Sequence, residues 1–366
     1  MRRAHPPRRP ASNRGAHLVL RHVDGESTVP VVPRTLPASW YGDPDVFDRE
    51  RRSVWEDEWV MFAPRDSLQR PGQYVADEVA GNPVFVAVER DGSLRGFHNV
   101  CPHRAGVIVW PGSGTAGNLV CRYHGWAFDW DGKLKAARDF GDEAGLCPDD
   151  RALAPISVAC WRNLVFVHLG DRPPPFDQAI APFAAECETF GIESFGYVRR
   201  VERSLACNWK TYADNYLEGY HVSSLHPSLS RVLDMSTYRV EVPHDSYCIH
   251  RAETAVGSPA GGAWLFRYPN LAVNIYADGM NVERIVPDGP ARTRVVYDYF
   301  AAAADEAQIE RMVEMSNVVL DEDQAICEAV QRNLDSGRYV TGPLSSRHEG
   351  AVHWFQSRVA RAAQPA

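Results

Sequence analysis

The sequence predicts an α+β protein with two domains. Its 366 residues exceed the usual size of one domain, although length alone is only a soft guide. Short apolar runs separated by turns fill residues 60–170, which is typical of an all-β domain. The second half combines several strand-like runs with one long helical pattern. We therefore expect a β domain followed by a mixed domain of strands and helices.

The composition indicates an ordinary globular protein. Hydrophobic residues make up 45% and charged residues 23% of the chain, which leaves ample material for a core. The net charge of −8 argues against nucleic acid as the main partner, because binding to phosphates requires a basic surface. No run approaches eighteen consecutive apolar residues, so no membrane span is expected. We expect a cytoplasmic protein whose cysteines stay reduced.

Residues 1–35 are expected to form a disordered tail. The first 23 residues contain many Arg and Pro residues and no Asp or Glu. A transit peptide is an alternative, but Pro6, Pro7 and Pro10 prevent the amphipathic helix that such a peptide requires. An upstream start codon would also explain this composition. Ordered structure is expected to begin near Leu36.

The first domain is expected to span residues 36–170. Apolar residues recur at helical spacing over Asp45–Trp59, which predicts a helix. Strands that end at turn signals are predicted at Val84–Val88, Ala127–Trp130 and Leu164–Leu169. The proline-rich segment Asp171–Phe176 is typical of a stiff linker, and we place the boundary between the domains there.

The second domain, residues 171–366, is expected to mix helices and strands. One helix is predicted near Asn208–His221, and a long helix from about Asp305 to Leu334. Between them lie predicted strands at Tyr238–Val242, Tyr247–Ala252, Ala263–Arg267, Ala272–Tyr276 and Thr293–Ala301.

Two Cys/His pairs indicate a metal cofactor in the first domain. Cys101 and His103 form one pair, Cys121 and His124 form the other, and 17 residues separate the two pairs. Glycines follow both pairs, so each pair is expected on a tight loop. A structural zinc site is the alternative, but zinc modules usually pair cysteine with cysteine and histidine with histidine. One Cys and one His in each loop suit a 2Fe–2S cluster in which two imidazoles replace two thiolates.

A second metal site is predicted after residue 208. On a continuous helix Asp214, Glu218 and His221 would share one face. Pro227 disfavours the helical conformation at His226, so the chain is expected to turn there and bring His226 beside His221. Two histidines and one carboxylate, with coordination positions left open, form the facial triad of non-heme iron. Candidates for the carboxylate lie on the long helix at Asp321, Glu322, Asp323 and Glu328.

The two loops resemble those of a known family. Phe97-His-Asn-Val-Cys-Pro-His-Arg-Ala-Gly106 and Cys121-Arg-Tyr-His-Gly-Trp126 resemble the cluster-binding loops in the alpha (large) subunits of ring-hydroxylating-type Rieske non-heme iron oxygenases. Neither loop carries the additional cysteine of respiratory Rieske proteins. Segments 268–276, 295–300 and 327–339 are similar to the branch of choline monooxygenase and of glycine betaine and carnitine oxygenases. The resemblance implies a Rieske 2Fe–2S domain and a helix-grip catalytic domain, whose antiparallel sheet packs on the long C-terminal helix.

The resemblance also implies roles for single residues. Cys101, His103, Cys121 and His124 would bind the cluster, and His221, His226 and Asp323 would bind mononuclear Fe(II). Asp323 is selected because the family places an Asp after an acidic residue and a Gln some eight positions later, here Gln331. Glu218 would link His221 to His124 of the next subunit in a homotrimer, and Asp214 is its rival for that role. Asn208 would lie near the iron.

The implied activity is that of a Rieske-type monooxygenase or dioxygenase acting on a small organic substrate. A quaternary ammonium compound is the favoured substrate, and an aromatic or natural-product substrate is the alternative. A cation would require aromatic side chains around it, and candidates are Tyr212, Trp264, Phe266, Tyr268 and Tyr276.

The implied partner is a separate NAD(P)H-dependent reductase, with or without a ferredoxin. We find no G-x-G-x-x-G dinucleotide fingerprint in this chain, so nicotinamide oxidation is expected on another polypeptide. An alternative of another class is a non-catalytic electron carrier that uses only the cluster.

Overall fold

The computed structural model describes residues 32–364, apart from residues 142–150, 254–261, 277–278 and 303–305. The predicted tail lies outside the described residues up to residue 31. From Pro33 the chain is hydrogen-bonded to the segment before the last helix: Leu344 N–H donates to Pro33 O at 2.8 Å, and Thr35 N–H donates to Gly342 O at 2.9 Å. Residues from Pro33 onward, three residues before the predicted start, thus already pack on the rest of the chain.

The predicted helix at 45–59 is shorter than expected. Helix α1 spans Pro44–Glu50, and a π-helical turn continues it over Arg51–Trp55. Asp43 caps its start by accepting a hydrogen bond from Asp45 N–H at 2.8 Å. The helical segment ends before Trp59, whose indole N–H instead donates to Pro174 O at 2.9 Å.

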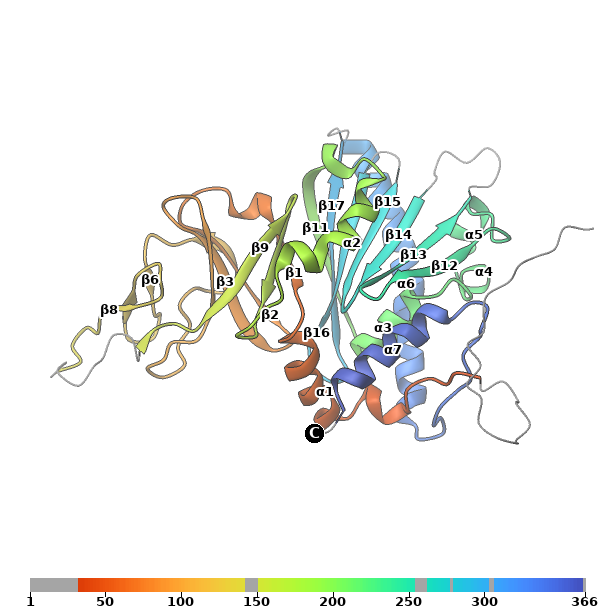
Figure 1. Cartoon of the computed structure of the whole chain (residues 1–366), viewed down its shortest axis with the longest axis horizontal. Coiled ribbons are helices and arrows are strands. Elements are labelled where there is room, and N and C mark those ends of the chain that lie inside the picture. The colour runs from red at the N-terminus through yellow and green to blue at the C-terminus, as the bar shows by residue number, and fades with distance from the viewer. Residues whose placement is uncertain (1–31, 142–150, 254–261, 277–278, 303–305, 365–366) are drawn as a thin grey trace, which may run out of the picture. The chain divides into compact units, whose positions relative to one another are not determined.

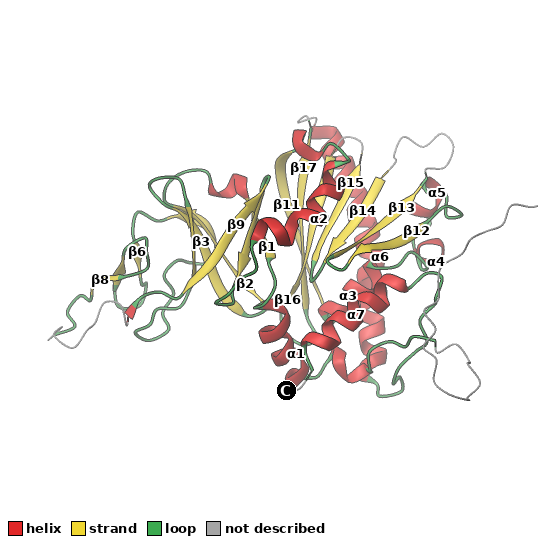
Figure 2. Cartoon of the chain, in the orientation of Figure 1, coloured by secondary structure: helices red, strands yellow, loops and turns green. Residues whose placement is uncertain are grey.

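The first half forms a seven-stranded antiparallel sheet and a small three-stranded sheet (Figures 1 and 2). The order in the large sheet is β1-β10-β9-β4-β3-β2-β5. Its strands are β1 Val60–Pro64, β2 Gln73–Val79, β3 Asn82–Val88, β4 Leu94–His98, β5 Gly112–Thr115, β9 Pro155–Trp161 and β10 Leu164–His168. The small sheet contains β6 Leu119–Val120, β7 Ala127–Phe128 and β8 Leu134–Ala136. The all-β character predicted for this half is confirmed.

The second half is built on another seven-stranded antiparallel sheet, in the order β11-β17-β16-β15-β14-β13-β12. Its strands are β11 Gly196–Leu205, β12 Arg239–His244, β13 Tyr247–Ala252, β14 Gly262–Arg267, β15 Leu271–Tyr276, β16 Gly279–Pro287 and β17 Thr293–Ala301. The five predicted strands are present. Strands β11 and β16 were not predicted, and each contains charged side chains that interrupt the apolar pattern.

Helices cover both faces of this second sheet (Figure 1). Helix α2, Phe176–Glu188, packs on the face that carries Ile249, Leu265 and Val273. Helices α3, Trp209–Tyr216, and α7, Gly350–Ala362, contribute to the core on the other face, together with the 30-residue helix α6, Glu306–Asp335. The short helices α4, Val222–Leu225, and α5, Leu229–Val232, follow α3. None of the helices in the described part has the length and apolar character needed to cross a membrane.

The helix predicted at 208–221 ends early. Helix α3 stops at Tyr216, and the chain turns through Leu217–Tyr220. Gly219 is required in this turn, because a Cβ there would lie 2.0 Å from the ring of Tyr238. Asp214 and Glu218 consequently do not share one helical face, and that part of the prediction was wrong.

Residues 33–55 pack against the second half of the chain. The Trp55 and Trp209 rings lie edge to face, with centroids 5.1 Å apart. A fully buried ion pair joins Lys210 Nζ to Glu50 Oε1 at 2.7 Å, and Trp209 Nε1–H donates to Glu50 Oε2 at 2.8 Å. Burial lowers the pKa of Lys210, and the carboxylate of Glu50 opposes that shift. The sequence instead grouped the helix near residues 45–59 with the first domain.

We expect Lys210→Met to destabilise the protein strongly. The substitution leaves the Glu50 carboxylate buried without its cation, which typically costs about 3–5 kcal/mol. The free energy of unfolding in urea would measure this loss. The double variant Lys210→Met/Glu50→Gln removes both charges and should recover part of the stability. A single variant as stable as the wild-type protein would contradict the role given to this ion pair.

Candidate functional site

The two Cys/His loops lie at one end of the first half, and the backbone closes them in the same way. Loop 101–106 precedes β5, and loop 121–126 joins β6 to β7. The N–H of each leading cysteine donates to the carbonyl at the end of its loop, at 2.8 Å in both cases (Cys101 to Gly106 and Cys121 to Trp126). The loops are tied together by Arg122 N–H, which donates to Val107 O at 2.8 Å. Two separate segments therefore present their side chains to one place.

The side chains of these loops fit a 2Fe–2S cluster. The Cys101 and Cys121 thiols are buried and free, and burial raises the pKa of Cys101 to about 11, with a contribution from Cys121 beside it. The His103 and His124 rings lie with centroids 4.7 Å apart. Trp126 stacks on His103 at 4.6 Å, and His103 Nδ1 is buried without a hydrogen-bond partner among the described residues. An iron atom would supply the missing partner.

A second group of ligands lies between the turn after α3 and the middle of α6. Three side chains, His221, His226 and Asp323, each offer one ligand atom, and these three atoms lie within 4.8 Å of one another. Asp323 Oδ1 is 3.1 Å from His226 Nε2 and 3.9 Å from His221 Nε2. As predicted, His226 leaves the helical conformation before Pro227, with φ −113° and ψ 79°. Two imidazoles and one carboxylate converge, which is the donor set of non-heme iron(II).

Further polar groups orient each of these three side chains. Glu218 Oε1 lies 2.6 Å from His221 Nδ1, and Glu322 Oε2 lies 2.7 Å from His226 Nδ1. Asn215 Nδ2–H donates to Asp323 Oδ1 at 2.7 Å. Because both Nδ1 atoms are engaged, both Nε2 atoms are left to face Asp323. The contacts of Glu322 and Asn215 were not foreseen, although Glu322 stands in the acidic run that supplied the candidates.

These carboxylates also set the electrostatics around His226. Its ring is buried, and burial lowers its pKa. The neighbouring carboxylates of Asp323 and Glu322 outweigh that effect, so the pKa of His226 is raised above its usual value. The site is therefore electronegative and favours a bound cation.

Asp323 stands apart from the other acids considered for this site. Asp321 pairs with Arg203 on β11, and Glu328 accepts a hydrogen bond from Ala206 N–H at 3.1 Å. Glu322 contacts the far side of the His226 ring. Only Asp323 joins the two histidines in the group of three described above.

Asp214 and Asn208 have other contacts. Asp214 Oδ2 accepts hydrogen bonds from Tyr41 Oη at 2.6 Å and Gln356 Nε2 at 2.9 Å, and burial raises its pKa to about 7. Asn208 caps α3: its side chain accepts from Lys210 N–H at 2.9 Å and donates to Pro290 O at 2.6 Å. A role for Asn208 near the iron stays a prediction.

The five candidate cage residues fall into two groups. The ring of Tyr268 lies 4.1 Å from the Arg358 guanidinium and packs against Phe355 of α7. The other four, Tyr212, Trp264, Phe266 and Tyr276, lie on α3 or on strands β14 and β15.

One glycine pattern requires a correction. Residues 112–117 do carry the G-x-G-x-x-G spacing. The structure places Gly112–Thr115 in strand β5, with β6 as the next regular element, so the pattern does not open a helix. A dinucleotide site requires the positive end of a helix at this point. The pattern therefore does not indicate nicotinamide binding.

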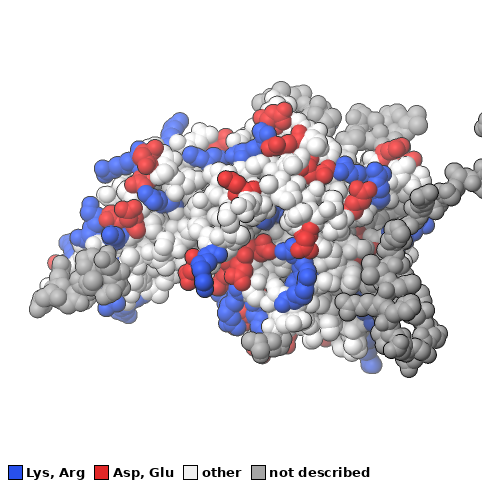
Figure 3. Space-filling model, in the orientation of Figure 1, with Lys and Arg blue, Asp and Glu red and all other residues white. Residues whose placement is uncertain are grey.

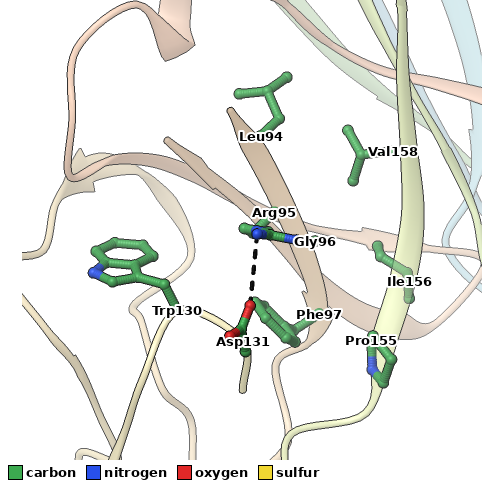
Figure 4. A pocket seen from close by; sticks show the side chains of 9 residues that line it. All are labelled: Leu94, Arg95, Gly96, Phe97, Trp130, Asp131, Pro155, Ile156 and Val158. Carbon is green, nitrogen blue, oxygen red and sulfur yellow. Dashed lines mark ion pairs between the residues drawn. The ribbon is translucent and has the colours of Figure 1, made fainter. Parts of the chain in front are cut away.

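A surface hollow in the first half carries none of the predicted site residues. Figure 4 shows it beside strand β4, where Arg95 lies 3.5 Å from Asp131 and the ring of Trp130 forms one side. Acidic and basic side chains are interspersed over the face shown in Figure 3.

Two family models match the chain. The model described as "Rieske [2Fe-2S] domain" matches residues 58–145. The model described as "Ring hydroxylating alpha subunit (catalytic domain)" matches residues 192–263 and 251–364. The first match contains both Cys/His loops, and the second contains His221, His226 and Asp323.

Similar proteins act on quaternary ammonium compounds. The chain is 30% identical to the chloroplastic choline monooxygenase of Beta vulgaris over 88% of its own length and 75% of the relative's. It is 26% identical to the carnitine monooxygenase oxygenase subunit of Acinetobacter pittii, over 91% and 95% of the two chains. A crystal structure of the quaternary ammonium Rieske monooxygenase CntA with L-carnitine superposes with a TM-score of 0.81 at 26% identity, covering 91% of this chain and 96% of that one.

We expect Gly106→Ala to impair the site formed by the two Cys/His loops. A Cβ at this position would lie 2.8 Å from Cys121 Sγ, and the resulting overpacking typically costs about 1–3 kcal/mol. The visible absorbance and the acid-labile sulfide per chain should both fall. Gly117→Ala is the matched control, because a Cβ there meets nothing within 4 Å. Equal cluster content in the two variants would contradict this account.

Proposed function

The chain belongs to the family of Rieske ring-hydroxylating oxygenase alpha subunits, and from that membership we propose that it oxidises a quaternary ammonium compound. The observation that carries the proposal is the agreement among its relatives. Curated relatives are named as choline, carnitine and glycine betaine monooxygenases, and they match 87–91% of this chain in three independent cases. A dioxygenase reaction, or an aromatic or natural-product substrate, is the alternative within the same family.

The residues in place fit both iron groups of the family. Cys101, Cys121, His103 and His124 would hold the 2Fe–2S cluster, and His221, His226 and Asp323 would hold the mononuclear iron. When bound, the cluster supplies single electrons and the mononuclear iron activates dioxygen.

The residues around the iron ligands would fix their geometry and protonation. Glu218 and Glu322 accept the Nδ1 protons of His221 and His226, which leaves each Nε2 lone pair available to a metal. Asn215 donates to one oxygen of Asp323 and limits the rotation of that carboxylate. With three protein ligands, coordination positions remain for dioxygen beside the substrate.

We further propose a head-to-tail homotrimer in which electrons cross between subunits. No hydrogen bond among the described residues joins His124 to Glu218 within one chain. Both lie next to exposed aromatic side chains, Tyr123 beside His124 and Tyr220 near Glu218. In a closed ring of such contacts, Glu218 would accept a hydrogen bond from His124 of the partner subunit and extend it to His221.

The electrons would come from another polypeptide. The carnitine relative is named an oxygenase subunit, which implies a separate reductase for this class of enzyme. We propose an NAD(P)H-dependent reductase, with or without a ferredoxin, as the partner of this chain. A chain that only carried electrons would have no use for the second group of metal ligands.

The substrate proposal is tested by oxygen consumption. Holoenzyme with a compatible reductase and NAD(P)H should consume dioxygen when choline, carnitine or glycine betaine is supplied, and mass spectrometry should find the oxidised product. Aromatic acids serve as the comparison. Oxygen uptake and product formation with an aromatic substrate alone would replace the proposed substrate class while preserving the reaction type.

We expect Glu218→Gln to slow turnover while both metals stay bound. The amide keeps the size of the side chain but cannot accept protons as a carboxylate does, and loss of such a partner typically costs about 10- to 100-fold in activity. Rapid mixing of the reduced protein with dioxygen and substrate would follow reoxidation of the cluster, and metal analysis would report occupancy.

Asp214→Asn is the comparison variant for this test. Its carboxyl contacts Tyr41 and Gln356, so reoxidation should keep its wild-type rate. Slow reoxidation in Asp214→Asn together with a normal rate in Glu218→Gln would transfer the bridging role to Asp214.

A further inference from the structure

A buried carboxylate lies on the sheet face that packs against α3 and α6. Glu283 stands in the middle of β16, opposite Tyr297 on β17 and Ala272 on β15, and its side chain is 1% exposed. On the same face Asn281 contacts Ser316 of α6. Glu283 therefore faces the interior between the sheet and the helix that carries Asp323.

One oxygen of the buried Glu283 carboxyl group, Oε1, has no hydrogen-bond partner among the described residues. The hydroxyls of Tyr212 and Tyr297, which lie 3.1 Å apart, and the side chain of Asn274 are hydrogen-bond partners of the carboxyl group and lower its pKa, but none of them donates to Oε1. Burial nevertheless raises the pKa of Glu283 to about 7. Burying a carboxylate that has no cation and one oxygen without a hydrogen bond is costly, which suggests that a ligand completes the site.

The neighbouring strand carries a buried carboxylate whose two oxygens both accept hydrogen bonds. Asp298 on β17 is fully buried on the opposite face. The guanidinium of Arg200 donates to both of its oxygens, at 2.8 and 3.0 Å, and Arg284 lies 3.8 Å away. Two buried carboxylates thus stand one strand apart, and only Asp298 has its cation supplied by the protein.

The surroundings of Glu283 belong to the region of the iron ligands. Asn281, two residues before Glu283 on the same face, contacts Ser316 of α6, and Asp323 lies seven residues, about two helical turns, further along that helix. On this face Tyr216 of α3 donates to Asn274 Oδ1 at 2.7 Å, and Asn274 donates to Asn281 Oδ1 at 2.7 Å. A ligand bound at Glu283 would therefore lie near the three metal ligands.

Among the described residues, the cations on this side of the sheet are already paired: the buried Lys210 of α3 is held by Glu50. Arg199 and Arg203 lie at the edge of this face and are held by Glu310 and Asp321 of α6. His250, on β13, is neutral, because burial lowers its pKa to about 3. The segments 254–261 and 277–278, which join these strands, contain no Lys, Arg or His in the sequence. Glu283 is thus left without a positive partner here.

We propose that Glu283, with the rings of Tyr212 and Tyr297, binds the ammonium group of the substrate, and that the site selects a cationic amino alcohol over a zwitterion that carries its own carboxylate. A carboxylate at the other end of the substrate would find no unpaired cation among the described residues of this face, whereas a hydroxyl would find amide and phenol partners. The inference rests on the proposed function and makes it more specific. Aromatic rings around a quaternary ammonium ion add cation–π attraction to the ion pair.

The wild-type holoenzyme tests the selectivity by calorimetry without dioxygen. Choline should bind more tightly than glycine betaine, and more tightly than the neutral isostere of choline in which carbon replaces nitrogen. Glycine betaine binding as tightly as choline would overturn the selectivity and leave the proposed function standing. If none of the ammonium compounds binds, the proposed function fails together with this inference.

The variant Glu283→Gln tests the residue itself. Choline should bind about 30-fold more weakly or worse, as when one partner of a buried charge pair is lost, whereas the carbon isostere should bind as before. Glu241→Gln is the matched control, because Glu241 is a solvent-exposed carboxylate of the same sheet paired with Arg239. Unchanged choline binding in Glu283→Gln would overturn the assignment.

Metal analysis and the cluster spectrum check that the variant is folded. If Glu283→Gln does not fold, Glu283→Asp keeps the charge on a shorter side chain. It should retain the preference for choline over the carbon isostere. Loss of that preference in a folded Glu283→Asp protein would count against the ion pair.

Discussion

The contact between α6 and α3 brings the three iron-site residues together. Asp323 belongs to a helix that begins 80 residues or more after the two histidines, so its position depends on how α6 lies along α3. Gln331 fixes that register: its Oε1 accepts Asn208 N–H at 2.9 Å, and its Nε2 donates to Tyr41 O at 2.9 Å. Asp323 lies eight residues earlier, about two helical turns, and is thereby held level with the turn after α3. The position of α6 along α3 thus determines whether the three metal-binding side chains come together.

The sequence was most informative where the chemistry is local. Each cluster loop carries its Cys and His within four residues, so short spacing alone predicted two loops and one cofactor. The strands at 247–252 and 293–301 were found to the residue, because apolar residues dominate them. Non-local partners were not accessible in the same way. Glu322 meets His226 across 96 residues, and only the packing of α6 makes that pairing visible.

Two errors share one physical cause, which is that the fold overrides local pattern. The helical periodicity after residue 208 continues past Tyr216, but Gly219 packs against Tyr238 and turns the chain. Strand β16 contains Glu283 and Arg284 side by side, which reads as a polar loop. In the sheet these two side chains point to opposite faces, and both are buried. Charged residues inside a strand are costly unless they have a partner or a function. The strand that was not predicted therefore carries Glu283, which faces the interior that we assign to substrate.

The attachment of residues 33–55 to the second half means that the cluster-bearing half is an insert. The chain leaves the larger body near Trp59 and returns near Pro174, where the indole of the first donates to the carbonyl of the second, and Gly170 N–H donates to Glu56 O at 2.8 Å. The two chain segments that connect the halves thus lie side by side, as is typical of a domain inserted within another domain. During synthesis on the ribosome the inserted half is complete before α3 emerges. Trp55 and Glu50 of the leading segment must therefore wait for α3, which follows the inserted half, before they meet Trp209 and Lys210.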